Sequence, residues 1–72
     1  MEETKKELNS ILIGLLHELG VPKVRIMLTM AIITAYNLQQ TMIDWLATYH
    51  GKEDTLTAHA FMSKLNELTD SE

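Results

Sequence analysis

The sequence predicts an all-α protein in which residues 1–72 fold as one compact four-helix bundle. Apolar residues recur at spacings of three and four, which is typical of helices that bury one face, and no segment shows the alternation of a strand. A content of 46% hydrophobic and 22% charged residues is typical of a folded domain. Glycine, proline and capping residues divide the chain into helices expected at about 3–19, 22–36, 38–50 and 58–68.

The first helix is expected over residues 3–19. One stripe of apolar residues at helical spacing supports it: Leu8, Ile11, Leu12, Leu15, Leu16 and Leu19. Gly20 stands where the end of a helix favours a left-handed residue. Pro22 suits the first turn of the next helix, because the N–H that proline lacks has no partner at that position anyway.

The second helix, expected over 22–36, is apolar on nearly every side. Ten of the thirteen residues from 24 to 36 are apolar. At about 100° per residue, Arg25, Thr29 and Tyr36 fall within a strip roughly 40° wide. A helix with so narrow a polar edge is expected to be enclosed by other helices. We therefore expect it to be the central helix of the bundle.

The third helix is expected over 38–50. Asn37 and Gln40 have the spacing of a capping box, which would start a helix after Asn37. The alternative is one continuous helix over 22–50, because the two apolar faces differ by only about 40° in helical phase. That helix would be roughly 43 Å long, too long for a monomer of this size to bury, and would imply a dimer.

The fourth helix is expected over 58–68. Gly51 ends the preceding helix, and Thr57 is the expected N-cap of the next. Leu56 and Phe61 flank Thr57 at the positions of a hydrophobic staple. Residues 69–72 are expected to be a frayed tail.

The charge of the chain argues against several partners. The net charge is −4, and only residues 21–37 form a positive segment, through Lys23 and Arg25. Non-specific binding of nucleic acid needs clustered basic residues, so a nucleic-acid partner is not expected. A helix lying on a membrane surface would normally carry Lys and Arg along its polar face, and this chain has few.

The location expected for the chain is the cytoplasm. The chain has no cysteine, which excludes disulfides and thiolate zinc sites and fits a reducing compartment. Acidic residues precede the first apolar run, and no cleavage site of small residues follows it, so a signal peptide is not expected. No apolar run reaches the roughly 18 residues of a transmembrane segment.

No group of residues has the spacing of a catalytic, cofactor or metal site. His17, His50 and His59 share no helix face, whereas histidine ligands on a helix are commonly four residues apart. The chain has no cysteine nucleophile and no glycine-rich phosphate loop. We therefore expect no enzymatic activity, no cofactor and no metal.

A helix-turn-helix DNA-binding regulator is the alternative function. The turn formed by Gly20, Val21 and Pro22 would join its two helices, with Lys23 and Arg25 as DNA contacts. The expected burial of residues 22–36 opposes this reading, because a helix in a core does not enter a DNA groove.

An interaction surface is the leading hypothesis. Ile13 and Ile43 point away from the apolar faces of their expected helices, and a patch that joins them to Ile32 or Tyr36 would mark an interface. Scattered surface residues are the alternative, because single exposed apolar side chains are common. The sequence thus favours a non-catalytic helical protein-interaction or regulatory module that binds a protein partner or forms a homodimer.

Three segments also suggest a family. The order LGVP, NLQQTMIDWL and TLTAHAFMSKL resembles short uncharacterised all-helical proteins of Gram-positive gut bacteria. The resemblance implies a bacterial cytoplasmic origin, and it carries no activity and no functional residue.

Overall fold

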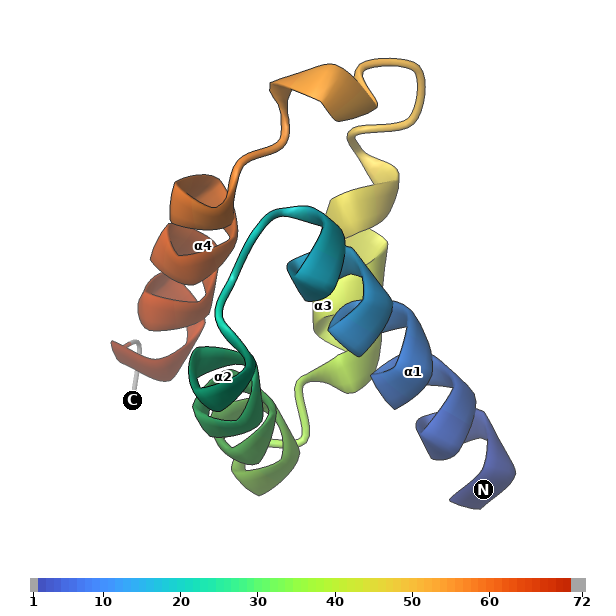
Figure 1. Ribbon diagram of the computed structural model, residues 1–72. Coiled ribbons are helices and arrows are strands. Elements are labelled where there is room, and N and C mark those ends of the chain that lie inside the picture. Colours follow the sequence, from blue (N-terminus) through green and yellow to red (C-terminus); the bar gives the residue numbers. More distant parts are fainter. Residues whose placement is uncertain (1, 71–72) are drawn as a thin grey trace.

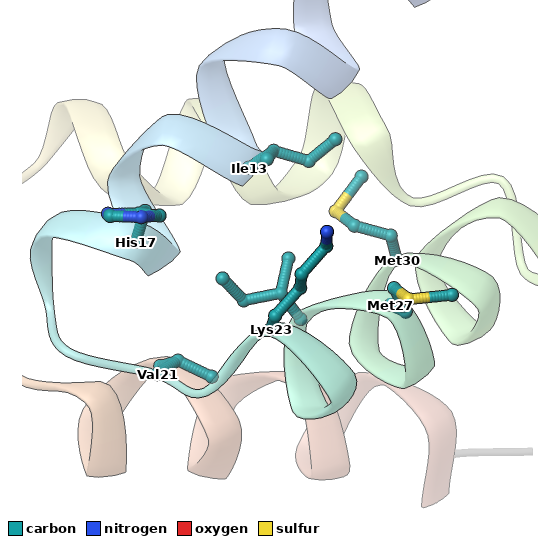
Figure 2. Close-up of a pocket in the computed structure, with 7 residues that line it drawn as sticks. Ile13, His17, Val21, Lys23, Met27 and Met30 are labelled. Atoms are coloured by element: carbon teal, nitrogen blue, oxygen red, sulfur yellow. The ribbon is translucent and has the colours of Figure 1, made fainter.

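The computed structural model describes residues 2–70, and the side chains of residues 4–70. These residues form four α-helices, one short 3-10 helix and no strand, which confirms the all-α four-helix bundle. Their order is α1 (Glu2–Glu18), α2 (Lys23–Ala35), α3 (Gln39–Ala47), η1 (Glu53–Thr55) and α4 (Ala58–Asp70) (Figure 1). In both views α2 lies between α1 and α4 (Figures 1 and 2).

All four α-helices contribute to one hydrophobic core. Five side chains are completely buried: Leu12, Leu16, Ile33, Met42 and Phe61. Trp45 is half-buried against this core, with its ring 6.3 Å from that of Phe61 and 5.2 Å from that of Tyr49, both edge-on. Helices α1, α3 and α4 each turn one apolar side toward this core.

The turn between α1 and α2 is fixed by a Schellman motif. Gly20 has a φ of 84°, as expected for a residue that ends a helix in the left-handed region. Its N–H donates to the His17 carbonyl at 3.1 Å, and the Val21 N–H donates to the Leu16 carbonyl at 3.1 Å. Val21 and Leu16 are both buried, which completes the motif with its usual apolar pair. Pro22 then occupies the N-cap position, directly before α2.

The break between α2 and α3 lies at Asn37, which excludes the continuous helix over 22–50. Asn37 has a φ of 55° and closes a second Schellman motif, in which the Leu38 N–H donates to the Ile33 carbonyl at 2.9 Å. The expected capping box is wrong, because Asn37 ends α2 and Leu38 takes the N-cap position of α3 without a side-chain hydrogen bond. The Gln40 amide instead donates to Asp44 Oδ1 at 2.9 Å.

Helix α3 ends at Ala47, earlier than the expected His50. The N–H groups of the next three residues donate to carbonyls three positions back, so the chain tightens into turns before Gly51 reverses it with a φ of 85°.

Helix α4 begins as the sequence predicts. Thr57 Oγ1 accepts the Ala60 N–H at 3.0 Å, which confirms Thr57 as the N-cap. Helix α4 extends to Asp70, two residues beyond the expected end at 68. The Thr69 hydroxyl donates to the Asn66 carbonyl at 3.2 Å. Residues 71 and 72 lie outside the described part of the chain.

Candidate interaction surface

Helix α2 buries only one of its sides. That side consists of Ile26, Thr29, Met30 and Ile33. Thr29 was expected on the polar edge, but only 4% of it is exposed. Its hydroxyl donates to the Arg25 carbonyl at 2.7 Å and lies 3.7 Å from Met62 Sδ of α4. Because the helix's own backbone satisfies the hydroxyl, Thr29 can face the core at little cost.

The opposite side of α2 is apolar and faces solvent. Six exposed residues form it, and we call them the outer face: Val24, Met27, Leu28, Ala31, Ile32 and Ala35. Val24, Met27 and Leu28 are 62–70% exposed. The expectation that other helices enclose α2 is therefore wrong. Both sides of this helix are apolar, but its neighbours in the bundle bury only one of them.

An open groove of about 680 Å³ runs between α1 and α2. Seven residues line it: Ile13, His17, Val21, Lys23, Ile26, Met27 and Met30. Figure 2 shows Ile13 reaching from α1 toward Met30, with Lys23 and Met27 beside them on α2. Met27 belongs both to the groove and to the outer face. The two features therefore form one continuous surface.

Three of the four interface residues expected from the sequence lie on or beside this surface. Ile13 is exposed at the groove, and Ile32 and Tyr36 are exposed on α2. By helical geometry, Tyr36 lies at the edge of the outer face opposite the groove. Ile43 does not belong to this surface, because it is half-buried and packs against the core. Its expected outward orientation is wrong.

Sequence reasoning missed the most exposed residues of the surface, Val24, Met27 and Leu28. Their spacing is that of an apolar helix face, but the same is true of the buried side of α2. The positions of the charged residues were the one feature of the sequence that could have indicated this exposure. Lys23 and Arg25 stand at one end of α2, which leaves its remaining length without any charge.

The electrostatics of α2 bear on the helix-turn-helix alternative. Lys23 and Arg25 are exposed at the first turn, and the helix contains no acidic residue. The objection that α2 is buried no longer holds, since its outer face is free. That face is apolar along its length, however, whereas a recognition helix presents polar side chains to base edges.

A shifted pKa is found outside this surface, at Glu53. The pKa of this carboxyl lies below the ordinary value of 4.5, chiefly because the Gly51 N–H donates to it at 3.0 Å, with His50 3.8 Å away. This pair lies in the exposed loop between α3 and α4. Among residues 2–70, no three histidine, cysteine or acidic side chains gather as a metal site would require.

No helix in the described part of the chain is long and apolar enough to cross a membrane. Comparison with known proteins gives no match to a family, to a curated protein or to a solved structure. The resemblance to proteins of gut bacteria therefore stays a prediction.

Proposed function

We propose that this protein is a non-catalytic protein-interaction module that binds through the outer face of α2 and the adjoining groove. The observation that carries the proposal is the exposure of Val24, Met27 and Leu28 on one side of one helix. Contact of apolar surface with water costs roughly 25 cal/mol per Å². Contiguous apolar patches on a small protein are therefore typical of binding sites.

A protein partner fits this surface better than DNA. Binding to DNA is driven largely by basic residues that neutralise phosphates, and the net charge of the chain is −4. Lys23 and Arg25 are the only basic residues of α2. An uncharged apolar strip gains little binding free energy beside a phosphate backbone. It gains much more against another apolar surface.

A protein partner also fits better than a membrane surface. An interfacial helix sinks its apolar face into the bilayer and keeps basic residues along the polar face. The side of α2 opposite the outer face is part of the hydrophobic core rather than a polar face. The net negative charge of the chain would in addition be repelled by anionic lipids.

The chemistry of the groove supports the non-catalytic part of the proposal. His17 and Lys23 are the only titratable residues that line it, and the other five lining residues are apolar. An apolar lining of this kind is more typical of a surface that binds an apolar side chain than of a site that carries out acid–base chemistry.

Photo-crosslinking tests the proposal in the cells that produce the protein. A benzophenone amino acid placed at Leu28 is expected to capture a protein, whether a second copy or another chain. The same group placed at Thr41, which is exposed on α3, is the matched control. Equal yields of protein adduct from the two positions would contradict the proposed function.

A further inference from the structure

We propose that the occupant of the outer face is a second copy of this chain. The two α2 helices pack antiparallel about a two-fold axis that passes between the levels of Thr29 and Met30. This inference rests on the proposed function, because it uses the same surface and names its partner. Four properties of α2 support it: side-chain size, charge, aromatic placement and exposed area.

The sizes of the residues along the middle of the outer face are self-complementary. That line runs from Val24 through Leu28 and Ala31 to Ala35, large residues first and small residues last. In the antiparallel register, Val24 of one copy lies opposite Ala35 of the other, and Leu28 lies opposite Ala31. Each large side chain therefore meets a small one, which allows two helices to approach closely and interdigitate.

The charges of α2 select the antiparallel orientation. Lys23 and Arg25 both stand in its first turn, so a parallel pair would bring four positive charges together. The antiparallel pair separates the two copies of Lys23 by about 20 Å along the helix axis and the two copies of Arg25 by about 14 Å. It also places the positive end of each helix dipole beside the negative end of the other.

Aromatic placement adds an attractive contact at each end. Arg25 and Tyr36 project from the same flank of α2, near its opposite ends. A two-fold axis across the helices places Arg25 of one copy on the same flank as Tyr36 of the other, about 3 Å apart along the helix axis, within reach of these long side chains. A guanidinium beside a phenol ring is a favourable cation–π pair. Both residues are exposed in the single chain and free to form it.

The exposed area is in the range that a dimer requires. The chain exposes 5148 Å². A folded monomer of its mass, 8.2 kDa, is expected to expose about 4,500 Å². The excess is several hundred Å², comparable to the roughly 800 Å² that each partner buries in a standard interface. An isologous contact along α2 and the rim of the groove would remove it.

Disulfide crosslinking tests the partner and the register together, because the natural chain has no cysteine. The variants are Val24→Cys and Ala35→Cys, both at exposed positions. After mild oxidation, neither variant alone is expected to crosslink above background. Their mixture is expected to give a species of twice the 8.2-kDa chain mass.

The expectation for the single variants follows from helix geometry. In the antiparallel register the two copies of residue 24 are about 16 Å apart along the helix axis. A disulfide requires Cα atoms within about 7 Å of each other. A mixture of Val24→Cys with Asn66→Cys, on the exposed side of α4, measures the background of random collisions.

Two results would overturn the inference. Efficient crosslinking of Val24→Cys with itself would show parallel packing. Crosslinking of the Val24→Cys and Ala35→Cys mixture no better than the Asn66→Cys control would show that a second copy does not occupy the face. If the photo-crosslinker at Leu28 then captures a different protein, the proposed function stands and only this inference fails. If it captures no protein, both fail.

Discussion

Gln39 is a polar side chain in an apolar position. It opens α3, only 4% of it is exposed, and its Oε1 atom is buried without a hydrogen-bond partner. A buried polar atom in that state has lost its water without compensation, at a cost of about 1–3 kcal/mol. We therefore expect Gln39 to reduce the stability of the bundle.

Replacing Gln39 with methionine, which has a similar length, is expected to raise the free energy of unfolding by about 1 kcal/mol. Urea denaturation followed by circular dichroism measures the change. Gln40→Met is the matched control, because Gln40 is exposed and its side-chain amide donates to Asp44 on the surface. A large loss of stability in Gln39→Met would mean that the amide has a partner essential for folding.

Met27 and Met30 allow the same chemical change at an exposed and at a buried position of α2. Met30 is buried in the core, whereas Met27 is exposed on the outer face. Met30→Ala is expected to lower the free energy of unfolding by about 2 kcal/mol or more, because it opens a cavity. Met27→Ala is expected to leave it nearly unchanged at concentrations where the chain is monomeric. Equal losses in urea denaturation would contradict the orientation of α2.

At the scale of elements, the local signals at helix ends were predictable, with two exceptions. Gly20 and Thr57 act as expected, because each residue type strongly favours one role at a helix end. Gly51 is left-handed as expected, but it reverses the chain four residues after α3 has ended at Ala47. Asparagine favours two roles, since it caps helix N-termini and also tolerates the left-handed region. The sequence therefore located the break at Asn37 but assigned the residue to the wrong helix.

Substitutions at Asn37 distinguish these roles. Asn37→Gly is expected to stabilise the protein by up to about 1 kcal/mol, and Asn37→Ala to destabilise it by about 1 kcal/mol, because alanine is strained at a φ of 55°. Thermal unfolding measures both changes. An N-cap role would instead make Asn37→Gly slightly destabilising.

The loop between α3 and α4 predicts a pH dependence. The pKa of Glu53 is lowered in the folded protein by the Gly51 N–H, its own backbone N–H and His50. Its ionised form therefore stabilises the fold above the ordinary pKa of 4.5, and this contribution is lost as the pH falls below that value. Glu53→Gln is expected to lower the melting temperature slightly at neutral pH and to have no effect in strong acid. An equal difference at both pH values would contradict this.

At the scale of the whole molecule, the helix count and helix positions follow from periodicity, but the exposure of α2 does not. Periodicity identifies a buried face when the opposite face is polar, as in α1, α3 and α4. In α2 both faces are apolar, so which one is buried depends on how the other three helices pack. The sequence indicated that α2 has more apolar surface than one contact needs. It could not show whether this bundle or a partner covers the excess.

The oligomeric state tests most directly whether a second copy covers the outer face of α2. Light scattering after size exclusion, across a concentration series, is expected to show the mass rising from 8.2 kDa to twice that value. Leu28→Glu should remain at 8.2 kDa with unchanged helicity, while Thr41→Glu on α3 should behave as the natural chain does. A natural chain that stays at 8.2 kDa at the highest concentration would contradict the dimer.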